Sequence, residues 1–381
     1  MKPKHTIMVE LSDIKHMEKL LKKFPKAQYT KKYGTFIEIT LPDEIDIREL
    51  TKIENQNYVK SAERVELIYP SSTSIQFNYF NAIDIINMWM EAEWYQQRGG
   101  VIHEANIAVI DRLFYIGHED LANRLVLPGR NVATNSADVD YRNVGETAAD
   151  AIHGTGCLGI VAAKNNSAAG VFSLALNSKA FPIAFGKCGS TTSMADAIRY
   201  AVDSGYKVIS LSYNVNPDVS YLRLACQYAY DNGVLLFAST GNDKSSTVTY
   251  PARYDTVVGV SGASSVDGFG SNYIDLAANY GLGVDFVGPF DGRSIFPDRL
   301  YGRVNGTSLS TPVIACLAAN LFSVEPSLTR SEVIQIMADS CIREHFKDED
   351  PRPSALYGYG IPQFTTALKT LFNRTSGIFL R

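Results

Sequence analysis

Three polar residues of the sequence stand where a reactive side chain would be exposed at the end of a regular element. Asp111 ends a short apolar run, His153 opens a run of small residues, and Ser308 lies between a glycine turn and an apolar, helix-like segment. A serine hydroxyl is a weak nucleophile that needs a base, and a histidine base needs a carboxylate to orient it. We therefore predict Ser308 as nucleophile, His153 as general base and Asp111 as orienting carboxylate. Each residue by itself has a commoner structural role, so the prediction depends on the combination.

A fourth polar residue, Asn242, follows the apolar run 234–238. Its side-chain amide can donate a hydrogen bond to the negatively charged oxygen that forms when a nucleophile attacks a carbonyl group. We predict that Asn242 is this oxyanion donor. The alternative is an ordinary turn residue after Gly241.

From about residue 101 the sequence alternates short apolar runs with helical patterns. This alternation predicts an α/β fold, with a mostly parallel sheet and helices on both faces. Such sheets bind ligands outside the carboxyl ends of their strands, where Asp111 and Asn242 stand. The apolar runs are 107–110, 208–211, 234–238 and 257–260, and the clearest helical patterns are 193–202 and 221–232.

The first 70 residues have a different pattern, β-α-β-β-α-β, which predicts a small ferredoxin-like α+β domain. Residues 71–100 contain a polar break and an apolar segment, and we interpret them as a linker and the start of the larger domain over 101–381. The expected strands are 5–11, 28–33, 35–41 and 65–69, and the expected helices are 12–24 and one that begins at Asp46.

The segments around these four residues resemble the signature blocks of the subtilisin-like serine proteases (subtilases), in the order Asp, His, Ser. The most specific are His153-Gly-Thr-Gly156 and Asn305-Gly-Thr-Ser308, and the likeness covers about 96–370. The resemblance implies a subtilisin-like fold and a serine endopeptidase that hydrolyses peptide or protein substrates through an acyl-enzyme, with no required cofactor. The sequence departs from the family at Gly156, where many members have a second histidine.

The resemblance also implies a substrate-binding surface. Two of its residues belong to a strand that pairs with substrate, and the others surround the first specificity pocket. Asn214 and Thr249 replace residues that are usually glycine, so we expect a narrow pocket that favours small or polar side chains. The implied residues are Gly189, Ser190, Ser212, Tyr213, Asn214 and Thr249.

The segment 164–170 resembles the calcium loop of the family, and Asp120 and Asn166 match two of its side-chain ligands. Oxygen ligands suit calcium. The segment therefore predicts either a structural calcium site or a plain turn.

Residues 1–70 resemble the propeptide of the family. This implies a zymogen whose N-terminal domain is an intramolecular inhibitor and is cut off by the catalytic domain at about residues 69–80. Two alternatives stay open: a permanent regulatory domain on a protein whose proteolysis is incidental, and an inactive binding protein on a subtilase scaffold.

The composition excludes several classes of partner. The 36 Lys and Arg and 40 Asp and Glu among 381 residues give a net charge of -4, which is too small and too mixed for a nucleic acid or a membrane surface. No run of 18 apolar residues occurs, so no membrane span is expected. The start of the chain lacks an apolar signal region. Five widely spaced cysteines indicate reduced thiols. We expect a cytoplasmic location, or secretion if a signal was removed.

One motif points to a different class of protein. Gly154, Gly156 and Gly159 fit the pattern G-x-G-x-x-G of dinucleotide-binding proteins. That pattern needs a preceding strand and an acidic residue about 20 positions later, yet no Asp or Glu occurs from 151 to 195. We therefore reject the dinucleotide interpretation.

Overall fold

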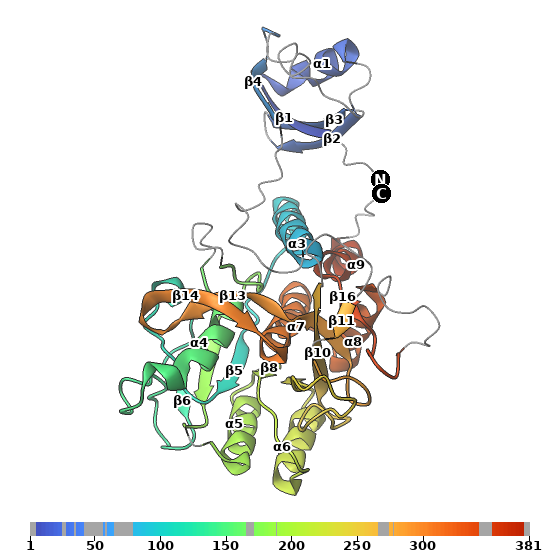
Figure 1. Ribbon diagram of the computed structural model, residues 1–381. Helices are drawn as coiled ribbons and strands as arrows, with labels where there is room; N and C mark the ends of the chain where they lie inside the picture. The colour runs from blue at the N-terminus through green and yellow to red at the C-terminus, as the bar shows by residue number, and fades with distance from the viewer. Residues whose placement is uncertain are drawn as a thin grey trace. The chain divides into compact units, whose positions relative to one another are not determined.

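The computed structural model describes most of the larger, C-terminal part of the chain and part of the N-terminal segment (Figure 1). The chain divides into two compact units, Met1–Ser72 and Thr73–Arg381, and the sequence predicts a boundary at residue 70. Each unit is described by itself. The described residues are 5–24, 28–33, 36–41, 56–57, 59–64, 79–164, 171–187, 189–265, 274–276, 278–342 and 353–376.

The smaller unit contains a four-stranded antiparallel sheet with the order β2-β3-β1-β4. Helix α1 follows the first strand. Because β3 lies between β1 and β2, the unit has the split βαβ arrangement of the ferredoxin-like pattern. The elements are β1 (His5–Leu11), α1 (Met17–Lys23), β2 (Gln28–Tyr33), β3 (Phe36–Leu41) and β4 (Val59–Arg64).

Two predicted elements of this unit, the helix from Asp46 and the strand over 65–69, lie outside the described residues. The structure has its fourth strand earlier, at Val59–Arg64, where the chain pairs with β1. Only Val59 and Ala62 are apolar in this strand, so alternating hydrophobicity does not mark it. Pairing with β1 determines its position instead.

The larger unit contains a mostly parallel sheet with the order β11-β10-β9-β8-β5-β7-β6, and β12 also pairs with β10. Among these pairings, only that of β10 with β11 is antiparallel. This confirms the predicted α/β fold. The strands are β5 (Ile107–Asp111), β6 (Arg130–Asn131), β7 (Ala180–Ala184), β8 (Val208–Leu211), β9 (Leu235–Ser239), β10 (Val258–Ser265), β11 (Ile274–Leu276) and β12 (Phe286–Pro289).

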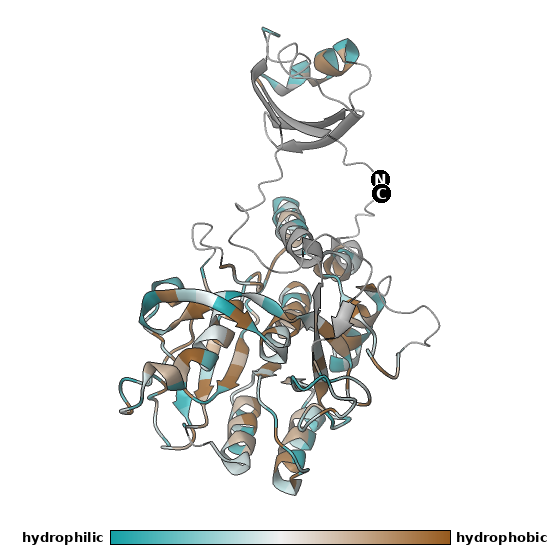
Figure 2. Ribbon diagram, in the orientation of Figure 1, coloured by the Kyte–Doolittle hydropathy of each residue, from teal (hydrophilic) through white to brown (hydrophobic). Residues whose placement is uncertain are grey.

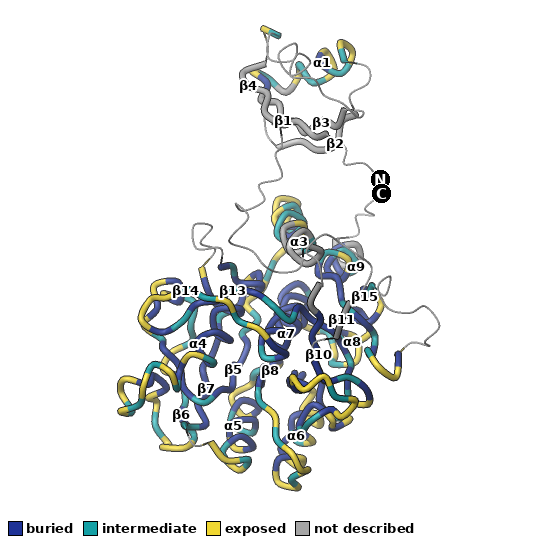
Figure 3. The backbone as a smooth tube through the Cα atoms, viewed as in Figure 1, coloured by how far each residue is buried: buried dark blue, intermediate teal, exposed yellow. Residues whose placement is uncertain are grey.

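Helices cover both faces of this sheet. In β5, Ile107 and Val109 belong to a core with α4 and α7, whereas Ala108 and Ile110 belong to a second core with α5 and α6. Because β5 is buried on both faces, all of its positions before Asp111 are apolar (Figure 2, Figure 3). The helices are α4 (Ala148–Ala162), α5 (Thr191–Asp203), α6 (Ser220–Asp231) and α7 (Thr307–Val324).

Helix α7 is the core helix of the larger unit. In the part of the chain that the structure describes, it is the single helix long and apolar enough to cross a membrane, with a mean hydropathy of 1.5. However, 94% of its residues are buried inside the protein, as in the central helix of a globular domain. Packing on all sides therefore holds α7, and with it the residues at its start, in a fixed position.

A β-hairpin precedes α7 and packs on α4 (Figure 1). Its strands are β13 (Asp291–Phe296) and β14 (Leu300–Asn305), which pair antiparallel. The Ser294 hydroxyl donates a hydrogen bond to the Gly156 carbonyl of α4 at 2.7 Å. The hairpin therefore forms a wall beside the start of α7.

The segment after the interdomain boundary forms α3 (Tyr79–Gln97), which packs against the last described helix, α9 (Phe364–Ser376). The Asp84 carboxylate accepts hydrogen bonds from the backbone N–H groups of Phe364 and Thr365 and so caps α9. The other elements are α8 (Arg330–Asp339), β15 (Cys341–Ile342) and β16 (Ile361–Pro362).

Candidate active site

Asp111 ends the central strand β5 and is fully buried. Its Oδ2 accepts a hydrogen bond from Nδ1 of His153 at 2.7 Å, and its Oδ1 accepts one from the Arg112 backbone N–H at 2.8 Å. A buried carboxylate is costly unless donors satisfy it in this way. Because Nδ1 is engaged, the free nitrogen of His153 for proton exchange is Nε2.

Close approach of α4 to the end of β5 makes this hydrogen bond possible. A Cβ atom at Gly154 would lie 2.3 Å from the Leu113 carbonyl oxygen and 3.1 Å from Cβ of Asp111. Glycine inside a helix costs about 0.5–1 kcal/mol relative to alanine. Here the missing side chain of Gly154 lets α4 approach β5 closely enough for His153 to form a hydrogen bond with Asp111. Since Gly154 lies well inside α4, the glycine motif is not a phosphate-binding loop.

Asp111 also influences the protonation of His153. Burial lowers the pKa of the imidazole, but the charge of Asp111 and its hydrogen bond more than offset burial, so the pKa lies above its ordinary value of 6.5. The Tyr213 ring packs edge-on against the imidazole with centroids 4.9 Å apart, and Phe185 packs on Tyr213 at 5.0 Å. These ring contacts hold the imidazole in one orientation.

Ser308 is the second residue of α7. Gly306, just before the helix, has φ 105°, in the left-handed region that favours glycine. The Ser308 hydroxyl donates to the Ser212 carbonyl at 3.4 Å, and the Ser212 hydroxyl donates to the Ser308 carbonyl at 2.9 Å. Ser308 and His153 line the same hollow. A nucleophile without bound substrate commonly lacks a short hydrogen bond to its base.

Pro312 explains why the Ser308 carbonyl can accept this hydrogen bond. In an uninterrupted helix that carbonyl would accept from the N–H four residues later, and proline has no N–H. Pro312 lies inside α7, and the Ser212 hydroxyl binds the carbonyl instead. Ser212 therefore holds Ser308 in place.

Asn242 follows β9 and is exposed. Its Oδ1 accepts hydrogen bonds from the Thr307 backbone N–H at 2.9 Å and from the Thr307 hydroxyl at 3.0 Å. These two donors fix the orientation of the amide, and its NH₂ group is the end left to donate. The Ser308 backbone N–H lies in the first turn of α7, where a helix offers no carbonyl partner. Both groups are donors that a bound anionic oxygen could use.

The family model of the subtilase family matches residues 103–360 of the chain. The chain belongs to the subtilase family. It is 35% identical to the thermophilic serine proteinase of Bacillus sp. (strain AK1) over 242 residues, which are 62% of this chain and 56% of that protein. It is 31% identical to thermitase of Thermoactinomyces vulgaris over 223 residues, which are 58% of this chain and 75% of thermitase. The chain therefore spans little more than half of the first of these relatives.

The solved structure of sphericase has the same fold. It superposes with a TM-score of 0.57 at 23% sequence identity and covers 69% of this chain and 92% of sphericase. At this identity the likeness supports the subtilisin-like fold and nothing finer.

Gly189 and Ser190, predicted to pair with substrate, line a hollow of about 530 Å³ in this subtilase. Lys187, from the same segment, forms ion pairs with Glu146 at 2.6 Å and with Asp150 at 3.3 Å. These pairs tie the segment to the start of α4. The sequence shows no sign of them, because the partners lie about 40 residues away.

The residues predicted around the first specificity pocket divide into two groups. Ser212 and Tyr213 contact Ser308 and His153, as described above. Asn214 and Thr249 lie on adjacent segments, because Val215 and Tyr250 exchange backbone hydrogen bonds at 2.7 and 3.0 Å. Thr249 donates its hydroxyl to the Thr240 carbonyl at 3.0 Å, so it can narrow a pocket but leaves no unpaired polar group there.

Asp120, one of the two predicted calcium ligands, is buried. Its Oδ2 accepts a hydrogen bond from the Tyr301 hydroxyl at 2.8 Å, and its backbone carbonyl accepts from the Lys164 N–H at 2.7 Å. The second ligand, Asn166, lies outside the described residues. Calcium needs six to eight oxygen ligands, and Asp120 with one oxygen already engaged does not supply them. The calcium site stays a prediction.

Cys157 lies close to both Asp111 and His153. Its sulfur, one carboxylate oxygen of Asp111 and one ring nitrogen of His153 lie within 4.8 Å of one another. Burial, with a smaller contribution from Asp111, raises the pKa of the thiol well above its ordinary value of 9.0. The thiol therefore stays protonated at neutral pH and is a poor nucleophile. The four described cysteines, 157, 226, 316 and 341, are buried.

The raised pKa of His153 predicts the pH dependence of activity. The base must be neutral to accept the serine proton, so activity should fall as the pH drops through the pKa in the folded protein, with a midpoint above 6.5. The pair of charged His153 with Asp111 also stabilises the folded protein, but with the opposite pH dependence. This contribution to the free energy of unfolding is complete below pH 6.5 and is lost as the pH rises through the pKa of His153 in the folded protein. A pH profile of kcat/KM measures the midpoint, with circular dichroism at each pH as control. A midpoint below 6.5 in a folded protein would contradict the arrangement.

The hydrogen bond from Ser212 predicts a positioning role for this residue. Ser212→Ala should lower kcat about fivefold and leave KM unchanged, since one hydrogen bond is worth about 1 kcal/mol and 1.4 kcal/mol is tenfold in rate. The matched control is Ser210→Ala in the same strand, because the buried Ser210 hydroxyl has no hydrogen-bond partner. Equal kcat values in the two variants would show that Ser212 does not position the nucleophile.

Proposed function

We propose that this subtilase is a serine endopeptidase with Ser308 as nucleophile, His153 as general base, Asp111 as orienting carboxylate and Asn242 as oxyanion donor. The observation that carries the proposal is the 2.7 Å hydrogen bond between buried Asp111 and His153, whose imidazole lines one hollow with Ser308. This supports the proposal because acyl transfer by a serine requires a base near the nucleophile and a carboxylate that orients the base.

In this mechanism the Ser308 hydroxyl attacks the scissile carbonyl while Nε2 of His153 takes its proton. Asp111 holds the imidazole through Nδ1 and stabilises its charged form. The negative charge on the carbonyl oxygen is met by the Asn242 amide and the Ser308 backbone N–H. His153 then gives the proton to the leaving amine, and water repeats the sequence on the acyl-enzyme. Every group in these steps belongs to the chain.

The acyl part of the substrate would lie on the side of Asn242. Gly189 and Ser190 line the hollow of about 530 Å³, and Asn214 and Thr249 stand on two paired segments. We propose that these residues bind the substrate backbone and the side chain before the scissile bond. A small side chain is favoured there because Asn214 and Thr249 add bulk.

A fluorophosphonate probe tests the nucleophile. It should label Ser308, as mapped by peptide mass, and Ser308→Ala should lose both labelling and peptidase activity while it keeps its melting temperature. Asn242→Ala should lose about 10²–10³ in kcat, the usual value of one oxyanion donor. The matched control is Asn232→Ala, another exposed asparagine at an element end, with its amide bound to the Tyr228 carbonyl. Labelling of a different residue would overturn the assignment.

We further propose that the N-terminal unit is an inhibitory propeptide that the catalytic unit removes. Its ferredoxin-like sheet supports the proposal. The wild type should yield a product cut at about residues 69–80, whereas Ser308→Ala should keep its full length. Wild-type enzyme added to Ser308→Ala then distinguishes cleavage within one chain from cleavage between chains. Products of equal length, both with the N-terminal unit attached, would instead favour a permanent regulatory domain.

A further inference from the structure

The loop 240–248 carries Asn242 and follows the buried strand β9. Residues 242–244 and 246–247 are exposed, so packing in a core does not hold this part of the loop in place. In the proposed mechanism, the position of the Asn242 amide determines how well the oxyanion is stabilised. The loop therefore has to be fixed by hydrogen bonds.

The side chain of Asn279, which is buried, forms these hydrogen bonds from the protein interior. Its Oδ1 accepts from the backbone N–H groups of Asp243 at 2.8 Å and Ser245 at 3.2 Å. Its Nδ2 donates to the Thr240 carbonyl at 3.1 Å. One buried amide thus binds the backbone both before and after Asn242.

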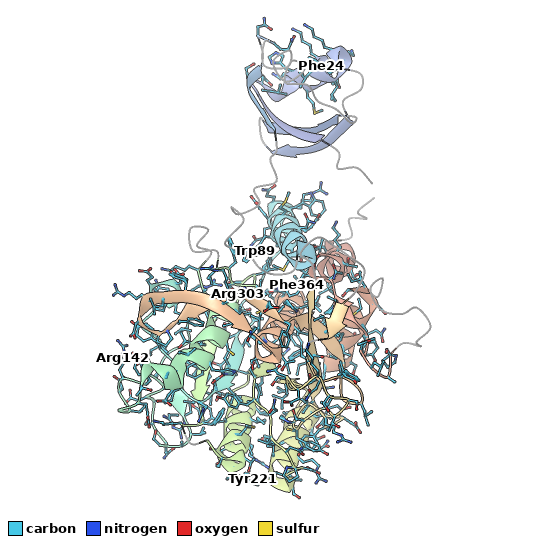
Figure 4. All side chains as sticks on the ribbon, in the orientation of Figure 1. Phe24, Trp89, Arg142, Tyr221, Arg303 and Phe364 are labelled. Carbon is cyan, nitrogen blue, oxygen red and sulfur yellow. The ribbon has the colours of Figure 1, made fainter. Side chains whose placement is uncertain are left out.

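The backbone of Asn279 is also fixed by hydrogen bonds. Its N–H donates to the Gly241 carbonyl at 2.9 Å, and its carbonyl accepts from the hydroxyls of Thr240 at 3.2 Å and Ser261 at 2.8 Å. Ser261 belongs to β10, which pairs with β9 in the sheet, and side chains of the larger unit pack around both strands (Figure 4). Asn279 is therefore a fixed point to which the loop is attached.

The backbone of the loop has the shape that this amide requires. Lys244 has φ 52°, in the left-handed region, and such a turn directs the N–H groups on its two sides towards one acceptor. Gly241 has φ 107°, and a Cβ atom there would lie 2.4 Å from Nδ2 of Asn279. A left-handed lysine costs free energy by itself. The hydrogen bonds to Asn279 offset that cost and so stabilise this shape of the loop.

Two separate contacts restrain Asn242. Thr307, at the start of α7, binds the side-chain oxygen of Asn242, as described above. Asn279, on the segment between β11 and β12, binds the backbone on both sides of it. Without Asn279, Thr307 would restrain only the end of an exposed side chain, and the backbone that carries this side chain would be free to shift.

We infer that Asn279 is a positioning residue that preorganises the oxyanion site by binding the backbone on both sides of Asn242. This inference rests on the proposed function, because the effect of Asn279 passes through the Asn242 amide. A displacement of about 1 Å at a reactive group costs about 10²-fold in rate. Asn279→Ala should therefore lower kcat about 10- to 100-fold and change KM by less than about twofold.

A double-mutant cycle tests the inference, with kcat measured for the wild type, Asn279→Ala, Asn242→Ala and the double variant. Because Asn279 acts through Asn242, Asn279→Ala should change kcat by less than about threefold once residue 242 is already alanine. A substitution that only destabilised the protein would lower kcat by the same factor in both backgrounds. Asn279→Ser serves if Asn279→Ala does not fold, because a serine hydroxyl is one bond too short to keep the contacts of the amide oxygen.

The matched control is Asn320→Ala in helix α7. Asn320 is also a buried asparagine whose amide binds backbone groups at both ends, namely the Leu174 carbonyl at 2.9 Å and the Leu176 N–H at 2.8 Å. These groups do not belong to the loop of Asn242. Asn320→Ala should therefore lower the melting temperature, as Asn279→Ala does, but keep the kcat of the wild type.

Hydrogen exchange tests the loop without any measurement of activity. In the inactive Ser308→Ala chain, the backbone N–H groups of the segment 240–249 are followed by mass spectrometry. Exchange in this segment should become faster when Asn279→Ala is added, because the N–H groups of Asp243 and Ser245 lose their acceptor. It should not change when Asn320→Ala is added.

An unchanged kcat in Asn279→Ala, or an equal loss of kcat with and without Asn242, would overturn the inference and leave the proposed endopeptidase intact. Unchanged hydrogen exchange in the loop would overturn it as well. An Asn242→Ala variant with the kcat of the wild type would refute the oxyanion role in the proposed function, and with it this inference.

Discussion

The contact between helix α4 and the end of strand β5 is the constraint on which the site depends. Asp111 ends a strand that is buried on both faces, and a carboxylate in that position must be met by donors. Gly154 lets α4 come close enough for His153 to be one of them, so the central strand and the imidazole share one hydrogen bond. An apolar residue in place of a buried charge is often equally stable or more so. Function explains the presence of Asp111 better than stability does.

A second constraint concerns helix α7. This helix is apolar and buried in the core, yet the polar Ser308 lies in its first turn and must be accessible. The left-handed Gly306 turns the chain into the helix, and Asn242 binds the Thr307 N–H that the helix itself leaves without a partner. Pro312 removes the partner of the Ser308 carbonyl, and Ser212 provides a new one. The polar groups at the start of the helix therefore hold Ser308 between two neighbouring strand ends.

Local sequence patterns predicted the mostly parallel sheet with its helices and the element ends at which Asp111, His153 and Ser308 stand, because a strand end, a helix of small residues and a glycine turn are local features. The contacts that hold these residues were beyond such patterns: Asn242 and Thr307 are 65 positions apart, and Ser212 and Ser308 are 96 apart. The family resemblance assigns Ser212 to substrate binding, and the structure adds that its hydroxyl donates to the Ser308 carbonyl. In the N-terminal unit, the alternation of apolar and polar residues did not predict β4, because that strand has few apolar residues.

The two ends of the large sheet have a consequence for a protein proposed to act on extended polypeptides. Open sheet edges attract extended chains, which add to them as an extra strand through backbone hydrogen bonds. Here the terminal strands are β6, with two residues, and β11, with three. Strands this short offer few backbone partners. Within the residues that the structure describes, an unfolded polypeptide therefore finds few backbone partners at either end of the sheet, and pairing of the protein with its own substrates along these edges is disfavoured.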